Sequence, residues 1–178
     1  RSIESVFKNT IKPDCFILTI DGPIPKLNKE IIDDISKIFP IKLNFIEKNL
    51  GLALALNNAL KLVKTEWVAR ADSDDINLSK RFEKQLKLTQ KDIGVIGSNI
   101  LEIDDNKEFP KLTKKLPLKN KEIKEFIKFR NPMNHMTVFY KTELINSVGG
   151  YPNIYLREDY ALWAKLINKK VVFYNIDE

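Results

Sequence analysis

The chain has 178 residues, of which 43% are hydrophobic and 30% are charged. This length is ample for one globular domain and short for two. Stretches without a charged residue, such as 49–60, are too short and too polar for the roughly 20 apolar residues of a membrane span. No secretory signal opens the chain, and the single Cys15 is expected to pack in the core without an internal disulfide. We therefore expect a single domain, residues 1–178, in a reducing cytoplasm.

The net charge of +6 favours anionic partners, which include nucleic acid, a membrane surface and phosphorylated substrates. The aromatic residues mostly fall at core spacing instead of alternating with basic residues, which argues against nucleic acid. One segment is markedly basic and carries seven lysines: Lys111, Lys114, Lys115, Lys119, Lys121, Lys124 and Lys128. This basic segment is either a solvated surface or a patch that rests on anionic lipid head groups, peripherally on the inner face of the membrane.

Strand-like and helix-like runs alternate, which is typical of an α/β domain with a mostly parallel central sheet flanked by helices. After a first helix that begins at Arg1, we expect strands at 15–20, 42–47, 66–71, 93–97, 99–103 and 136–140. Apolar residues at helical spacing predict helices at 27–38, 52–63, 78–86, 123–127, 142–148 and 158–168. A turn is expected at 104–107 and an irregular, exposed region around 110–117.

Three carboxylates follow the predicted strand 66–71 within four residues, at Asp72, Asp74 and Asp75. Alternate side chains of an extended segment point the same way, so Asp72 and Asp74 could grip one hard cation such as Mg²⁺ or Mn²⁺. The pattern alone is weak, because an acidic turn that caps the next helix is the simpler interpretation. A calcium loop that begins at Asp72 is excluded, since its fifth and sixth positions are Ile76 and Asn77.

The carboxyl ends of the predicted strands carry further acids. Asp21 follows the strand 15–20 in the same way that Asp72 follows the strand 66–71. In open α/β sheets, ligands bind at that edge. A shared ligand site is therefore favoured over two unrelated acidic turns.

Several short motifs follow one another along the chain: TIDG at 19–22, KNLGLA at 48–53, ARADSDD at 69–75 followed by Arg81, Phe82 and Gln85, NPMNHMT at 131–137, GGY at 149–151 and EDY at 158–160. Together they resemble glycosyltransferase family 2, whose members have the GT-A nucleotide-sugar-binding fold. Each motif by itself is weak evidence for the family, but the combination, which extends from about Ser2 to Val172, is specific for it.

The resemblance implies a donor site for a nucleotide sugar. Asp21 resembles the acid that receives the uracil or ribose, and Lys48 and Asn49 resemble the loop beside the base. For Asn49 the alternative is a turn that caps the next helix. Arg70 resembles the residue near the donor phosphates, with a surface ion pair as its alternative.

The resemblance also implies a role for each carboxylate. Asp72 and Asp74 resemble the site of the metal, Mn²⁺ or Mg²⁺, and of the diphosphate, and Asp75 resembles a supporting or sugar-facing acid. In the acid pair Glu158 and Asp159, the aspartate resembles the catalytic base. Acids at a helix start are also favoured by the helix dipole, so the pair alone does not identify a catalytic base.

The lone His135 has three interpretations. It is a third metal ligand, a contact to the acceptor, or an ordinary hydrogen-bonded histidine. Family members usually begin with an apolar strand, and we expect this chain to lack that strand and any C-terminal extension. At 21–23 the chain has Asp-Gly-Pro where many relatives have Asp-Asp-Gly-Ser. That variation resembles a subgroup linked to bacterial surface glycans.

The expected function is an inverting, metal-dependent transfer of a sugar from a nucleotide-diphosphate donor, with UDP favoured, to a saccharide or lipid-linked acceptor. Two alternatives remain. A sugar nucleotidyltransferase would use a similar scaffold but should show a Gly-rich, basic phosphate loop near the amino terminus. A non-catalytic saccharide or nucleic-acid binding module would need neither the metal nor Asp159.

Overall fold

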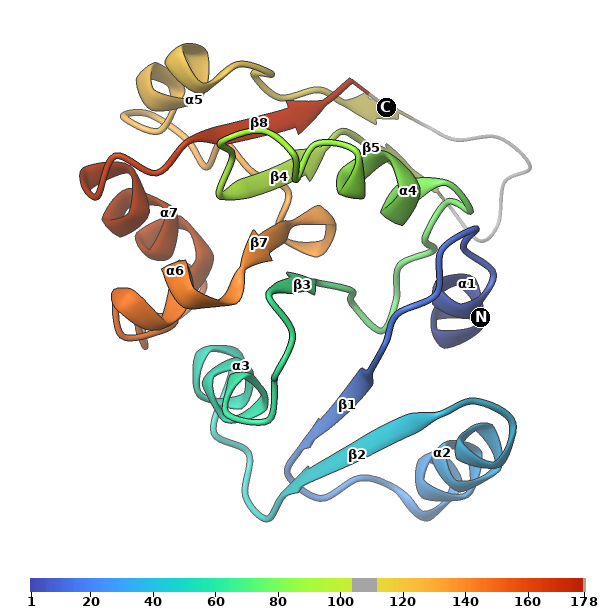
Figure 1. Ribbon diagram of the computed structural model, residues 1–178. Coiled ribbons are helices and arrows are strands. Elements are labelled where there is room, and N and C mark those ends of the chain that lie inside the picture. The colour runs from blue at the N-terminus through green and yellow to red at the C-terminus, as the bar shows by residue number, and fades with distance from the viewer. Residues whose placement is uncertain (104–111, 178) are drawn as a thin grey trace.

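The computed structural model describes residues 1–103 and 112–177 (Figure 1). Its helices are α1 Ser2–Phe7, α2 Lys26–Ile38, α3 Leu52–Leu60, α4 Arg81–Leu86, α5 Asn120–Phe126, α6 Thr142–Ser147 and α7 Glu158–Asn168, with a 3₁₀ turn, η1, at His135–Thr137. Its strands are β1 Phe16–Asp21, β2 Ile41–Ile46, β3 Trp67–Ala69, β4 Val95–Ser98, β5 Ile100–Glu102, β6 Leu112–Lys114, β7 Phe139–Lys141 and β8 Phe173–Ile176.

The strands form three sheets in the part of the chain that the structure describes. β1 and β2 pair in parallel, with Phe16 opposite Ile41 and Asp21 opposite Ile46. The larger sheet has the order β3-β7-β4-β8, in which β7 is antiparallel to both neighbours and β4 is parallel to β8. β5 and β6 form an antiparallel pair. The predicted α/β fold is confirmed, although antiparallel pairing has a larger share than expected.

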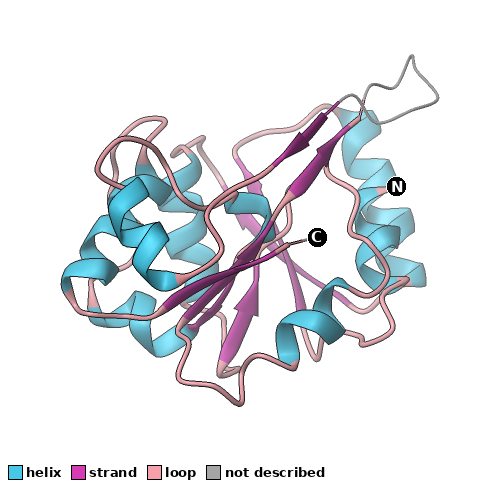
Figure 2. Cartoon of the chain, turned by 90° about the horizontal axis from the view of Figure 1, so that it is seen from above, coloured by secondary structure: helices cyan, strands magenta, loops and turns pink. Residues whose placement is uncertain are grey.

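The strands lie between two groups of helices (Figure 2). The main core is built around the fully buried Trp163 of α7, which packs with Leu162 and Leu166 of the same helix and with Tyr140 of β7 and Phe173 of β8. Alternating strand residues and one stripe of α7 therefore bury each other, as their sequence periods predict. This core fixes the start of α7, where Glu158 and Asp159 lie.

The unit formed by β1, β2 and α2 is much less covered. α2 has the predicted apolar stripe, yet none of its residues is buried, and Leu27, Ile31 and Ile38 are 65%, 49% and 72% exposed. Cys15 precedes β1 and is exposed, so the expectation that it packs in the core is wrong. A two-stranded sheet offers too little surface to bury a whole helix face.

Other expectations differ in detail. The region expected to be irregular contains β6, whose pairing with β5 the local sequence did not reveal. β8 was not foreseen, and the residues expected to start a strand at 136 form η1. The expected turn at 104–107 lies outside the described residues. No described helix is long and apolar enough to cross a membrane.

Candidate active site

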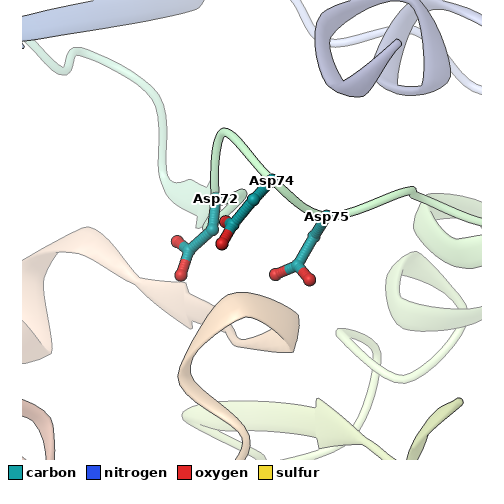
Figure 3. A group of neighbouring side chains, drawn as sticks. All are labelled: Asp72, Asp74 and Asp75. Carbon is teal, nitrogen blue, oxygen red and sulfur yellow. The ribbon is translucent and has the colours of Figure 1, made fainter. Parts of the chain in front are cut away.

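The acidic loop after β3 brings three carboxylates together. β3 ends at Ala69, and the backbone N–H of Asp75 donates to the carbonyl of Asp72 (3.4 Å), so the loop turns at Ser73 and Asp74. A turn, not the alternation of an extended strand, thus sets the geometry. Oxygens of Asp72, Asp74 and Asp75 lie within 4.8 Å of one another, and the three side chains point to the same side of the loop (Figure 3).

Two arginines frame this loop. The Nη2 atom of Arg70 lies 2.6 Å from Oδ1 of Asp72, in an ion pair that is largely shielded from solvent. Arg81 donates to the carbonyl of Arg70 (2.7 Å) and to the side chain of Asn77, which ties the two ends of the loop together. Burial, and then the charge of Arg70, lower the pKa of Arg81 to about 10, so the guanidinium stays charged at neutral pH.

Helix α1 holds the loop from the other side. The hydroxyl of Ser2 donates to the carbonyl of Asp72 (2.7 Å), and the hydroxyl of Ser5 accepts from the backbone N–H of Asn77 (2.9 Å). Because hydrogen bonds fix both ends of the loop, the carboxylates are preorganised. The sequence named the carboxylates but gave no sign of this support from α1.

The carboxylates fit a hard divalent cation. Oδ2 of Asp75 is buried and has no hydrogen-bond partner, which is costly unless another group satisfies it. Burial, followed by the charges of Asp72 and Asp74, raises the pKa of Asp75. A bound cation would give this oxygen a partner and would stabilise the ionised form of Asp75. Ligands that are all oxygen atoms suit Mg²⁺ or Mn²⁺.

A second group of predicted residues lies at the end of β1. The carboxylate of Asp21 accepts the backbone N–H groups of Leu50 (2.8 Å) and Gly51 (2.9 Å), just before α3. The side-chain amide of Asn49 donates to the carbonyl of Asp21 (3.2 Å). Gly22 has φ +94, and a Cβ there would lie 2.7 Å from the backbone nitrogen of Asn49, so only glycine fits.

These bonds tie the β1 end to the loop before α3, and Lys48 in that loop is exposed. Asp21 and Asn49 are thus brought together as predicted. The side chain of Asn49 donates to Asp21 and does not cap α3, so the capping interpretation of Asn49 does not describe this side chain. Each carboxylate oxygen of Asp21 keeps a free lone pair for a ligand.

His135 begins η1 and packs against Tyr151. Its Nε2 lies 3.1 Å from the Tyr151 hydroxyl, and its ring also approaches Trp163. Burial, and then the charge of Arg70, lower the pKa of His135 to about 3, so the ring is neutral at physiological pH. His135 is not among the described residues whose ligand atoms cluster with Asp72, so the geometry does not support its interpretation as a third metal ligand, and its ring is hydrogen-bonded to Tyr151.

Asp159 lies in the first turn of α7, partly exposed, whereas Glu158 is buried. One Asp159 oxygen accepts the side-chain amide of Asn131 (2.6 Å), and the other accepts the backbone N–H of Tyr160 (2.6 Å). Of the acid pair, Asp159 is therefore the one an acceptor can reach.

Tyr151 is buried and contacts His135 and Asn57. Burial raises its pKa most strongly, and the charges of Arg70 and Asp159 act on it in opposite directions. Both charges are thus near one buried hydroxyl.

Three residues of the site were missed as functional by sequence reasoning: Arg81, Asn131 and Tyr151. Each belongs to a segment that carried the family resemblance, but none stood out chemically. Arg81 acts through Asn77 and the carbonyl of Arg70, and no local sequence pattern indicates the second of these contacts. Asn131 and Tyr151 act through contacts with distant segments, which no local pattern reveals.

Comparisons with known proteins identify the family of this chain. The sequence model described as "Glycosyl transferase family 2" matches residues 1–147. The chain is 40% identical over 167 residues to UDP-Gal:alpha-D-GlcNAc-diphosphoundecaprenol beta-1,3-galactosyltransferase of Escherichia coli, covering 93% of this chain and 60% of that protein. It is 34% identical over 170 residues to the amylovoran biosynthesis glycosyltransferase AmsE of Erwinia amylovora, covering 94% and 63%.

The fold also matches solved structures. Mannosyltransferase PcManGT from Pyrobaculum calidifontis, solved with GDP-Man and Mn²⁺, aligns with a TM-score of 0.73 at 14% identity, over 99% of this chain and 50% of that one. The chain thus spans about 60% of the length of the curated relatives it matches. The fold is GT-A, and the chain belongs to glycosyl transferase family 2.

Proposed function

We propose that the protein is an inverting, metal-dependent glycosyltransferase. It moves a sugar from a nucleotide-diphosphate donor, with a UDP-sugar favoured, to a saccharide or lipid-linked acceptor in bacterial surface-glycan synthesis. The observation that carries this proposal is the preorganised acidic loop, whose three carboxylates have oxygens within 4.8 Å of one another. The name of the E. coli relative gives a UDP-sugar donor and a diphosphoundecaprenol-linked acceptor, which supports the same classes here.

The acidic loop would serve the donor diphosphate. Asp72, Asp74 and Asp75 would hold Mn²⁺ or Mg²⁺, because three carboxylates whose oxygens lie within 4.8 Å of one another attract a cation. When bound, the ion supplies Lewis-acid stabilisation of the leaving diphosphate. Arg70 keeps Asp72 in place and adds a positive charge beside the loop.

The transfer step needs one base. Asp159 accepts the proton of an acceptor hydroxyl as that oxygen bonds to the anomeric carbon from the face opposite the nucleotide. The bond from that carbon to the diphosphate oxygen breaks, and its electron pair leaves with the nucleoside diphosphate. A single displacement inverts the anomeric configuration and needs no covalent intermediate.

The β1 end would bind the nucleoside. Asp21 and Asn49 present polar groups at the loop before α3, and the exposed Lys48 adds a positive charge. His135 is neutral, so its contribution would be to orient the Tyr151 hydroxyl. Glu158 is buried in the first turn of α7 and would support the start of that helix.

A membrane contact near α5 would suit a lipid-linked acceptor. The described part of the basic segment has exposed Lys119, Lys121 and Lys128, and the next residue, Phe129, is 82% exposed. A shallow pocket of about 240 Å³ between Ile127 and the start of α7 adjoins this surface. Basic and apolar groups side by side favour an anionic bilayer surface.

The test is Asp159→Asn, which keeps shape and removes the base. We expect transfer from a UDP-sugar to fall by about 10² to 10⁴, while donor affinity and melting temperature stay unchanged. Asp92→Asn, at an exposed turn before β4, is the matched control and should transfer normally. Near-normal transfer by Asp159→Asn would refute the catalytic assignment, and loss of donor affinity would move Asp159 to the nucleotide site.

A further inference from the structure

The side chain of Asn131 has only one chemically sensible orientation. Its Oδ1 accepts the backbone N–H of Met133 (3.2 Å), so its Nδ2 must be the atom that faces Asp159. That Nδ2 donates to Oδ2 of Asp159 at 2.6 Å. A hydrogen bond to an ionised carboxylate is stronger than one between neutral groups.

The segment that carries Asn131 is firmly anchored. The carbonyl of Pro132 accepts from the amide of Asn175 in β8 (3.0 Å), and Met133 is 2% exposed. Asn134 donates to the carbonyl of Ser98 in β4 (2.9 Å). Asn131 therefore reaches Asp159 from a loop that is anchored on β4 and β8 and is not part of α7.

The bonds to Asp159 leave it competent as a base. Asn131 holds Oδ2 and the backbone N–H of Tyr160 holds Oδ1, so the carboxylate plane cannot rotate freely. Each oxygen accepts one hydrogen bond and keeps a second lone pair for the acceptor proton. Both side chains are partly exposed, so an acceptor hydroxyl can approach.

We infer that Asn131 is a positioning residue for transfer: its amide fixes the carboxylate of Asp159 in the orientation that takes the acceptor proton. The inference rests on the proposed function, because it assigns the base to Asp159. Misplacement of a reacting group by about 1 Å can cost about 10²-fold in rate. Loss of the amide donor should therefore lower kcat and leave donor binding intact.

Asn131→Asp is the sharpest variant. It keeps the oxygen that accepts the Met133 N–H, and hence the local turn, but replaces the donor to Asp159 by a second carboxylate oxygen. At pH 8 we expect kcat to fall about 10²-fold with the KM for the donor unchanged. If Asn131 only supports the turn, Asn131→Asp should transfer normally, while Asn131→Ala should lower the melting temperature.

A double variant separates positioning from structure. Asn131→Asp combined with Asp159→Asn restores an amide-to-carboxylate hydrogen bond in the reverse direction, so it should fold well. Because Asn131 acts through Asp159, the double variant should transfer at the rate of Asp159→Asn alone. A further, multiplicative loss would overturn the inference.

Failure of the inference is distinguishable from failure of the proposed function. If Asp159→Asn transfers normally, the base assignment is wrong and Asn131 has nothing to position. If Asp159→Asn loses transfer but Asn131→Asp does not, the base stands and only the role of Asn131 is rejected.

Discussion

Helices α2 and α7 have comparable lengths, 13 and 11 residues, and both carry an apolar stripe, but they are buried very differently. α7 packs on the four-stranded sheet and buries Leu162, Trp163 and Leu166, whereas α2 lies beside the two-stranded β1–β2 unit and buries no residue. An apolar stripe thus predicts a helix but not how well the helix is covered. The well-covered region around α7 contains Asp159, and the less covered unit formed by β1, β2 and α2 contains the predicted nucleoside contacts.

The largest expected difference is in stability. Trp163→Ala removes the side chain at the centre of the main core and should lower the free energy of unfolding by about 3–5 kcal/mol. Leu27→Ala on α2, where the side chain is 65% exposed, should change it by less than about 0.5 kcal/mol. Urea unfolding of both variants measures this contrast. Equal losses would mean that α2 is covered as well as α7.

The two regions should also differ in membrane binding. Replacing Lys119, Lys121 and Lys128 by glutamine should weaken binding to anionic vesicles by up to about 10²-fold, since each lysine near the surface contributes about 1 kcal/mol. The matched control replaces the exposed Lys26, Lys29 and Lys37 of α2 and should bind nearly normally. Sedimentation with vesicles at rising salt, where screening increases, gives the readout. Binding that is indifferent to salt or to lipid charge contradicts a contact at α5.

A smaller effect on stability is expected in the unit formed by β1, β2 and α2. Asp21→Ala leaves the N–H groups of Leu50 and Gly51 without their carboxylate, which should cost about 1–2 kcal/mol of stability and weaken nucleotide binding. Asp14→Ala, before β1, should change neither property. Thermal melts with and without UDP measure both effects. An Asp21→Ala protein that melts and binds normally would show that Asp21 neither caps the loop nor contacts the nucleoside.

Sequence reasoning found local features and missed contacts between distant segments. The full extent of α7 and the acidic cluster follow from apolar spacing and from three carboxylates within four residues. The pairing of β6 with β5 and the bond from Asn131 to Asp159 depend on partners that are remote in the sequence, 28 residues away in the second case. The expectation of an extended segment at Asp72 and Asp74 is wrong, whereas the alternative of an acidic turn agrees with the hydrogen bond from the N–H of Asp75 to the carbonyl of Asp72.

The central claim is that the acidic loop binds a divalent ion together with a nucleotide diphosphate. Calorimetric titration of UDP with and without Mn²⁺ tests it directly, using Asp74→Ala and the control Asp92→Ala. We predict that UDP binds tightly only with Mn²⁺, that Asp74→Ala abolishes this dependence along with most of the affinity, and that Asp92→Ala behaves like the unchanged protein. Equal UDP affinity with and without Mn²⁺ would contradict the account and leave the three carboxylates as a turn held by α1 and Arg81.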